Sequence, residues 1–224
     1  MTKYGEKTYW DSRYKNNTDS FDWYQDYNGL RDTFSSNINK DGKILMVGCG
    51  NSLLSEEMNK DGYKMIVNID ISTVIIDQLR EKYKNCKGLE YMAANIMETP
   101  FKDDFFDFII DKGTFDAIMC GDNLHSNALQ MCEEIYRILK PLGKFILISY
   151  GEPDDRLFYL EQEETEWNIE VLEIPKPTTS QQKGVHYVYI MTKQEYQDDD
   201  DDDDNEDEED DDDNSESDTT EDNN

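Results

Sequence analysis

Two glycines and an aspartate at a fixed spacing are the residues of this sequence that point most clearly to a binding site. Gly48-Cys49-Gly50 follows an apolar run at residues 43–47, which is typical of a buried strand. Asp70 lies twenty residues past Gly50, at the end of a second such run. A glycine-rich turn lets the backbone approach a ligand, and a carboxylate at this spacing accepts both hydroxyls of a ribose. The pattern therefore predicts a site for an adenosine-type cofactor.

Residue 53 helps to choose between cofactors of this type. A dinucleotide-binding turn takes Gly or Ala there, whereas this chain has Leu53, so the pyrophosphate of NAD would be poorly accommodated. S-adenosylmethionine has no pyrophosphate and carries a sulfonium cation, which an acidic, aromatic-lined cleft stabilises. We therefore favour S-adenosylmethionine and keep an NAD-dependent oxidoreductase as an alternative. A tight turn followed by a solvated aspartate is the simplest purely structural explanation.

The elements that must position these residues follow from apolar runs that alternate with helix-period segments. We expect strands at residues 43–47, 64–70, 89–94, 105–110, 144–150, 169–174 and 185–191. Only a short turn separates the last two, so they should form an antiparallel pair. The order of elements predicts an α/β fold with a doubly wound, mostly parallel, seven-stranded Rossmann-like sheet and an antiparallel last strand.

Helices are expected between these strands. One should begin near Ser52 and end at Asp61-Gly62, where glycine permits a left-handed cap. Ser72 should cap the next helix at its N-terminus. A third helix is expected over residues 128–139, until Pro141-Leu142-Gly143 breaks the apolar period.

The negative charge of the chain is concentrated at its C-terminal end. The 224 residues carry 52 acidic and 22 basic side chains, and 19 of the acidic ones lie at residues 198–224, which hold no Lys or Arg. We therefore expect residues 194–224 to be a disordered acidic tail and residues 1–193 to be one domain. Residues 1–197 still carry a net charge of −11, which disfavours a nucleic-acid partner.

Apolar runs and cysteine spacing indicate the compartment. The sequence shows neither a run long enough to span a membrane nor the apolar core of a secretion signal. Cys49, Cys86, Cys120 and Cys132 lack C-x-x-C spacing and lie in apolar segments, which favours reduced core thiols over disulfides or metal ligands. We expect a soluble cytoplasmic protein with access to the nucleus and with no membrane partner.

Four motifs in a fixed order carry a resemblance to a known family. They are Tyr9-Trp10-Asp11-Ser12-Arg13-Tyr14, Phe21-Asp22-Trp23-Tyr24, Ile44-Leu45-Met46-Val47-Gly48-Cys49-Gly50-Asn51-Ser52 and Asp111-Lys112-Gly113-Thr114-Phe115-Asp116-Ala117. Together they resemble the class I, seven-strand methyltransferases that modify lysine in translation elongation factor 1-alpha. The resemblance extends from about residue 9 to residue 193 and leaves out the acidic tail. It implies S-adenosylmethionine as cofactor, a lysine of elongation factor 1-alpha as acceptor, and a monomer.

The resemblance also implies which residues contact the cofactor. An aromatic lid within residues 1–40 would close over it, and further contacts would reach its methionine, ribose and adenine parts. In that order, the residues are Trp10, Tyr14 and Trp23 for the lid, Gly48 for the methionine, Asp70 and Ile71 for the ribose, Asn95 and Ile96 for the adenine, and also Lys112. Position 95 is commonly Asp in the family. Asn95 can still accept a hydrogen bond from the adenine amino group through its side-chain carbonyl.

Asp111 is the residue that we expect closest to the acceptor amine, where it could orient the ammonium group and receive its proton through water. Simpler explanations exist for two of the other features. Trp10, Tyr14 and Trp23 could belong to an N-terminal helix that packs on the sheet, and Lys112 could be a solvated loop charge.

Two other classes of function stay open. A small-molecule methyltransferase is one, because the same fold serves many acceptors. The other is a non-enzymatic protein whose acidic tail binds basic partners.

Overall fold

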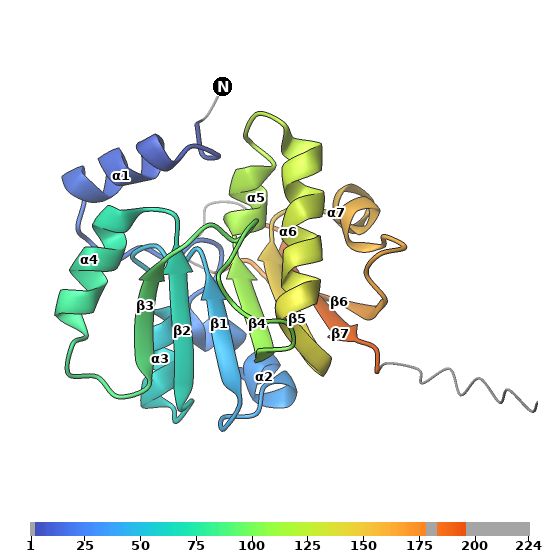
Figure 1. The fold of residues 1–224 in the computed structure, drawn as a ribbon, viewed down its shortest axis with the longest axis horizontal. Helices are drawn as coiled ribbons and strands as arrows, with labels where there is room; N and C mark the ends of the chain where they lie inside the picture. Colours follow the sequence, from blue (N-terminus) through green and yellow to red (C-terminus); the bar gives the residue numbers. More distant parts are fainter. Residues whose placement is uncertain (1–2, 178–182, 196–224) are drawn as a thin grey trace, which may run out of the picture.

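The computed structural model describes residues 3–177 and 183–195, so the predicted acidic tail lies outside the described residues except for its first two. Within them, seven strands form one sheet in the order β3-β2-β1-β4-β5-β7-β6 (Figure 1). The strands are β1 (Lys43–Val47), β2 (Met65–Asp70), β3 (Leu89–Ala93), β4 (Phe106–Lys112), β5 (Leu139–Ser149), β6 (Trp167–Pro175) and β7 (Val185–Lys193). β1 to β5 are parallel, and β7 is antiparallel to both of its neighbours. The predicted fold class and the antiparallel last pair are confirmed.

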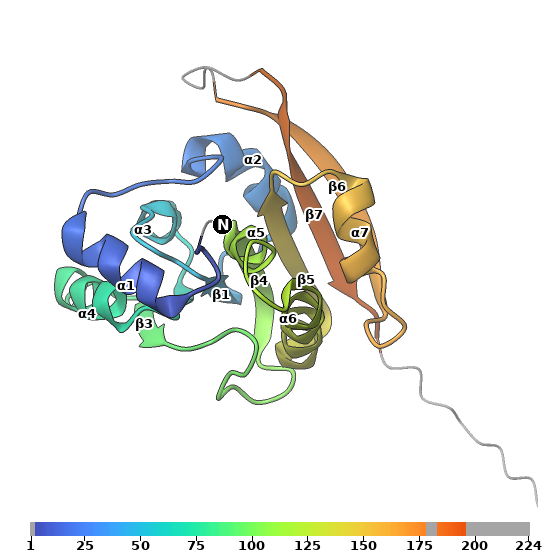
Figure 2. The same cartoon turned by 90° about the horizontal axis from the view of Figure 1, so that it is seen from above.

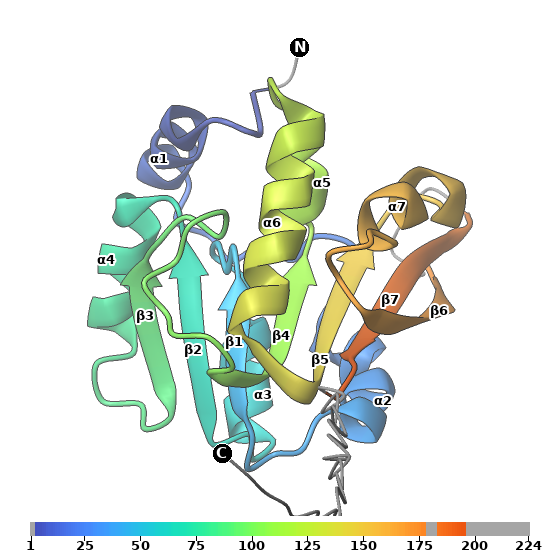
Figure 3. The same cartoon turned by 45° about the vertical axis from the view of Figure 1, so that its right-hand side comes forward.

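Helices cover both faces of this sheet. They are α1 (Lys7–Asn16), α2 (Tyr27–Asn37), α3 (Leu54–Lys60), α4 (Thr73–Lys82), α5 (Thr114–Ile118), α6 (Leu124–Ile138) and α7 (Pro153–Leu160). α2, α3 and α4 pack on one face, and α5, α6 and α7 pack on the other (Figure 3). α1 lies beyond the ends of the strands, beside α4 (Figure 2).

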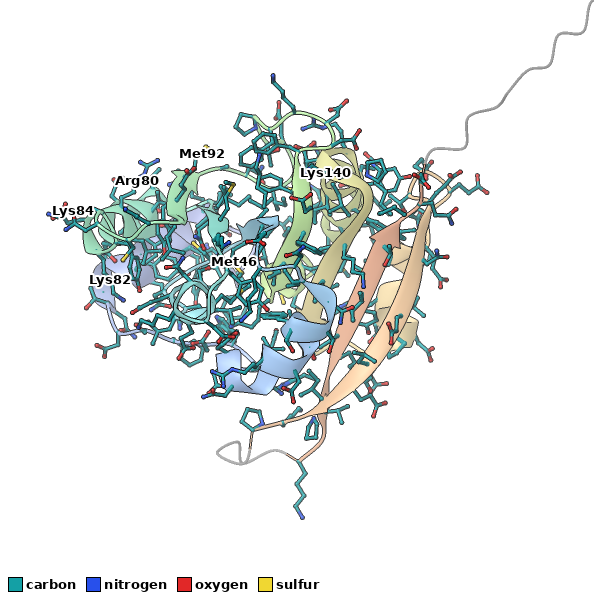
Figure 4. The ribbon with its side chains drawn as sticks, turned by 90° about the horizontal axis from the view of Figure 1, so that it is seen from below. Met46, Arg80, Lys82, Lys84, Met92 and Lys140 are labelled. Carbon is teal, nitrogen blue, oxygen red and sulfur yellow. The ribbon has the colours of Figure 1, made fainter. Side chains whose placement is uncertain are left out.

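The alternation of side chains along β1 explains the two packed faces. Ile44 and Met46 belong to the core cluster beneath α2, α3 and α4, whereas Leu45 and Val47 belong to the cluster beneath the other helices. A parallel strand that is covered on both sides is apolar along its whole length. Met46 accordingly lies inside the molecule, while Arg80 lies at the outer edge of α4 (Figure 4).

The helix expected over residues 128–139 does end before Pro141, because α6 stops at Ile138. The start of the next strand was predicted too late, because Pro141-Leu142-Gly143 does not separate it from the helix. β5 already begins at Leu139, and these three residues lie in an irregularity between the pairing of Leu139 with Phe106 and that of Lys144 with Phe108. α6 therefore leads directly into β5. Proline, which has no N–H to donate, is tolerated where a strand ladder is interrupted in this way.

The two predicted helix boundaries have different outcomes. Gly62 adopts φ 102° just past the end of α3, which confirms the left-handed cap. Ser72 does precede α4, but its hydroxyl forms no cap. It donates instead to Asp11 Oδ1 at 2.6 Å and so ties α1 to the start of α4.

The cysteines lie in different environments. All four are free; Cys49 and Cys132 are buried, Cys120 is half-buried and Cys86 is exposed, so the prediction of core thiols is wrong for the last two. The described ranges hold no cluster of three His, Cys, Asp or Glu side chains that could bind a metal. In the same part of the chain, no helix combines the length and the apolar character needed to cross a membrane.

Candidate functional site

Asp70 ends β2 beside the turn that follows β1, because the two strands pair in parallel with Val47 opposite Ile69. Its Oδ2 accepts the N–H of Gly50 at 2.9 Å and its Oδ1 accepts the N–H of Ser72 at 2.8 Å. The residue is only 6% exposed. Burial raises the pKa of Asp70 to about 6, against the lowering effect of the two backbone N–H groups. These donors fix the carboxylate and leave further lone pairs on both oxygens for a ligand.

The turn after β1 needs glycine at both of its predicted positions. Gly48 and Gly50 have φ values of 55° and 51°, in the left-handed region that residues with a Cβ rarely adopt. A Cβ at Gly48 would also lie 1.9 Å from Thr114 Oγ1, and one at Gly50 would lie 2.8 Å from the Tyr14 hydroxyl. The turn is thereby packed tightly between α1 and the start of α5.

A cavity of about 1120 Å³, including space open to solvent, lies beyond the carboxyl ends of the central strands. It is lined by every residue for which a cofactor contact was predicted: Trp10, Tyr14, Trp23, Gly48, Asp70, Ile71, Asn95, Ile96 and Lys112. These residues come from the N-terminal segment and from the carboxyl ends of β1, β2, β3 and β4 or the residues just after them. The structure therefore brings the predicted set together in one place.

Asn95 and Ile96 line the part of the cavity that follows β3. Asn95 Oδ1 accepts the N–H of Met97 at 3.1 Å, which closes a local turn of the kind that asparagine favours. Ile96 is buried, at 5% exposure. The amide oxygen keeps a second lone pair, so the prediction that Asn95 accepts from an amino group is compatible with this turn.

Aromatic rings from the N-terminal segment cover the cavity. We call the rings of Tyr4, Trp10, Phe21 and Trp23, all of which line it, the aromatic roof. Trp10 stacks on Tyr14 with ring centroids 5.8 Å apart, and its Nε1 donates to the backbone oxygen of Tyr4 at 2.6 Å. The explanation by an N-terminal helix is compatible with the place of Trp10 and Tyr14 at the cavity, because α1 packs on α4 and presents these rings to it. It is wrong for Trp23, which lies between α1 and α2.

Lys112 is not a loop residue. β4 extends to it, and it pairs with Ile148 of β5. Its side chain is 5% exposed, and its Nζ donates to Asp22 Oδ1 at 3.0 Å and to the backbone oxygen of Trp23 at 3.1 Å. Burial lowers the pKa of Lys112, and the Asp22 carboxylate opposes that effect. The alternative of a solvated charge is wrong.

Asp111 lies next to the cavity without lining it. Its carboxylate is fully buried and accepts the N–H groups of Thr114 at 2.7 Å and Phe115 at 2.8 Å. Burial raises the pKa of Asp111 to about 7, although both backbone donors favour the ionised form. This placement suits a residue that fixes the turn after β4. Its expected contact with the acceptor amine stays a prediction.

Sequence reasoning missed several residues of the site. Tyr4 and Gly5 line the cavity, although no motif marked them. Phe21 and Asp22 belong to the second motif, so that motif could have marked them as residues of the site. A Cβ at Gly5 would lie 2.8 Å from the Cα of Gly121, so the start of the chain packs closely on the segment after α5.

A buried polar network beside the cavity was also missed. Tyr24, which has an unusual φ of 63°, donates its hydroxyl to Asp116 Oδ2 at 2.8 Å. Asp116 Oδ1 accepts from Ser149 Oγ at 2.6 Å and from Arg156 Nη2 at 2.8 Å. The four residues come from four separate segments, so no local pattern could have joined them. The network anchors the strained end of the N-terminal segment to α5 and α7.

Comparison with known proteins identifies the class. A methyltransferase domain family matches residues 45–147. The chain is 29% identical over 202 residues to EEF1A lysine methyltransferase 4 of Mus musculus, covering 85% of this chain and 76% of that protein. It is 30% identical over 176 residues to the Bos taurus protein of the same name, covering 74% and 69%. The fold and these matches define an S-adenosylmethionine-dependent methyltransferase. Within that class, the chain belongs to the family that the EEF1A lysine methyltransferase 4 proteins represent.

Solved structures share the fold. A SAM-dependent methyltransferase from Methanosarcina mazei superposes with a TM-score of 0.59 at 18% identity and covers 78% of this chain and 99% of its own. A TehB-like SAM-dependent methyltransferase from Corynebacterium glutamicum gives a TM-score of 0.59 at 17% identity, with 84% and 98% covered. At such identities the likeness concerns the fold alone.

Proposed function

We propose that this chain binds S-adenosylmethionine in the cavity and transfers its methyl group to the ε-amine of a protein lysine, with translation elongation factor 1-alpha as the acceptor. The observation that carries the proposal is the Asp70 carboxylate, which Gly50 and Ser72 hold at the wall of a roofed cavity. The names of the relatives, EEF1A lysine methyltransferase 4, support the choice of acceptor.

The groups that line the cavity fit this cofactor. The remaining lone pairs of Asp70 suit the two ribose hydroxyls, which are donors, and the free lone pair of Asn95 suits the adenine amino group. Trp10 and Trp23 line the cavity with aromatic rings, which suit a sulfonium cation because the π-system of such a ring attracts positive charge. Lys112 is neutralised in part by Asp22, which limits its repulsion of that cation.

When bound, S-adenosylmethionine would supply a methyl group on a positively charged sulfur. That sulfur is the leaving group when an amine nitrogen attacks the methyl carbon in line, and it departs as a neutral thioether. The chain supplies orientation, and holding reacting groups in line can be worth roughly 7–11 kcal/mol of the barrier. By covering part of the cavity, the aromatic roof would limit the access of water and so favour the uncharged form of the incoming lysine. Asp111 contributes by fixing the turn that follows Lys112 at the end of β4.

The proposal is tested by supplying methyl-labelled S-adenosylmethionine together with purified elongation factor 1-alpha or with an extract of the chain's own cells. Mass spectrometry then maps the label. We expect it on a lysine of elongation factor 1-alpha, and we expect much less of it with Asp70→Asn at the same cofactor concentration. Label found only on small molecules would overturn the choice of a protein acceptor, and label on another protein would overturn the choice of elongation factor 1-alpha. No transfer at all would overturn the proposal.

A further inference from the structure

Arg13 lies among three aromatic rings. Its guanidinium carbon is 6.0 Å from the ring centroid of Trp10, 5.7 Å from that of Phe21 and 5.8 Å from that of Trp23. These distances are within the range in which a cation is attracted by an aromatic face. The ion pair on α1 in this region joins Lys7 to Asp11 at 2.5 Å and does not involve Arg13.

The three rings come from two separate pieces of the chain. Trp10 belongs to α1, which the Asp11–Ser72 hydrogen bond ties to α4. Phe21 and Trp23 follow α1 and contact each other edge to face, with centroids 5.1 Å apart. All three rings line the cavity, whereas Arg13 does not. Arg13 therefore contacts these rings without facing the cavity, at the place where α1 meets the segment that carries Phe21 and Trp23.

We propose that Arg13 is a positioning residue that joins the two pieces of the aromatic roof and thereby sets the affinity of the cavity for its cofactor. The inference rests on the proposed cofactor site. A guanidinium group suits this role because it is planar, always charged and weakly hydrated, so it stacks on several rings at little cost in solvation. Without it, Trp10 stays anchored on α4 through α1, but Phe21 and Trp23 lose one of the contacts that hold them against it.

Equilibrium titration with S-adenosylmethionine tests the role of Arg13 in the variants Arg13→Gln and Arg13→Lys. Arg13→Gln keeps polarity and loses the cation, so we expect about tenfold weaker binding. Arg13→Lys keeps the charge and should recover part of the loss. Arg31→Gln is the matched control, because the Arg31 guanidinium carbon lies 5.2 Å from the Tyr27 ring centroid in α2 and Arg31 does not line the cavity. Binding by Arg13→Gln as tight as that of the parent would overturn the proposal.

A second measurement needs no cofactor. Acrylamide quenching of tryptophan fluorescence reports mainly on Trp10 and Trp23, because Trp167 is 7% exposed and donates its Nε1 to the backbone oxygen of Leu160. We expect stronger quenching in Arg13→Gln than in the parent and in Arg31→Gln. Equal quenching in all three would overturn the role of Arg13. A parent that fails to bind S-adenosylmethionine would instead overturn the proposed function, and the quenching would still test Arg13.

Discussion

Lys112 and Asp22, which are ninety residues apart in the sequence, form an ion pair of 3.0 Å between the end of β4 and the N-terminal segment. The Lys112 ammonium also donates to the backbone oxygen of Trp23 at 3.1 Å. The side chains are 5% and 18% exposed, so salt screens this contact less than a surface pair. The sheet thereby holds the segment that carries Trp23 directly over the cavity.

Lys112→Met should release that segment. The change removes both contacts and leaves the Asp22 carboxylate without its cation, so we expect the free energy of unfolding to fall by about 2–3 kcal/mol. Urea denaturation measures this loss, and a titration should show weaker S-adenosylmethionine binding. Lys64→Met is the control, because it removes the exposed Lys64–Asp41 pair, and such pairs contribute about 0–1 kcal/mol. Equal losses in the two variants would contradict the role given to Lys112.

Asp111→Asn separates a positioning role from direct contact with the acceptor. The amide can accept from only one of the Thr114 and Phe115 N–H groups and turns its own NH2 toward the other. We expect the free energy of unfolding to fall by about 2 kcal/mol, with weaker cofactor binding and slower turnover. Denaturation, titration and a transfer assay measure the three effects. Slow turnover at unchanged stability and affinity would place Asp111 at the acceptor amine instead.

Cofactor affinity should depend on pH through Asp70. Burial raises the pKa of Asp70 to about 6, and a protonated carboxyl has lost part of its capacity to accept from the ribose hydroxyls. Affinity should therefore fall as the pH is lowered through about 6. Titrations between about pH 5 and pH 8 measure this dependence, and Asp70→Asn should lack it. Asp11 and Lys7, the charged groups near Asp70, act on its pKa in opposite directions.

The raised pKa of Asp70 also predicts the direction in which the free energy of unfolding changes with pH. The folded pKa of Asp70 lies above the ordinary value near 4, so the folded state binds this proton more tightly than the unfolded state does. The contribution of Asp70 to the free energy of unfolding should therefore decrease as the pH rises from about 4 to about 6, and stay constant above. An opposite slope, measured as the difference between the parent and Asp70→Asn, would contradict the raised pKa.

Deletion of residues 198–224 should leave cofactor binding within about twofold of the parent and should leave most transfer activity. β7 ends at Lys193, whose ammonium donates to the backbone oxygen of Leu139 at the start of β5. Because β7 is antiparallel to β5, the chain leaves the sheet at the end of the strands opposite to the carboxyl ends that border the cavity (Figure 1). Titration and a transfer assay on the truncated chain check the expectation. Loss of transfer at unchanged cofactor affinity would give the acidic tail a part in acceptor recognition.

The Gly48 turn and Asp70 could be predicted from the sequence because their placement is local. Each directly follows or ends an apolar run, and parallel pairing of two adjacent strands brings such ends together without any further information. The order of apolar runs likewise predicted the seven strands. The predicted lining residues outside this pair, from Trp10 to Lys112, were implied by the family resemblance rather than by spacing.

Lys112 and Pro141 show what local patterns could not provide. Asp-Lys-Gly-Thr has the composition of a loop, yet pairing with β5 extends β4 to Lys112, and a carboxylate from ninety residues earlier makes its burial tolerable. Pro141 is a residue that usually lies outside strands, yet it belongs to β5. The strand accommodates it because the pairing of β4 with β5 is irregular there. In both cases the deciding partner lies far away in the sequence.

Calorimetric titration of S-adenosylmethionine into the parent, Asp70→Asn and Asp77→Asn is the most direct test of the cofactor site. Asp77 is an exposed residue of α4 that pairs with Arg80 at 3.6 Å. We expect the parent and Asp77→Asn to bind alike and Asp70→Asn to bind about 10- to 100-fold more weakly, because hydrogen bonds to a charged acceptor are lost. Binding of equal strength by all three proteins would show that Asp70 does not hold the ribose, and would contradict the site described above.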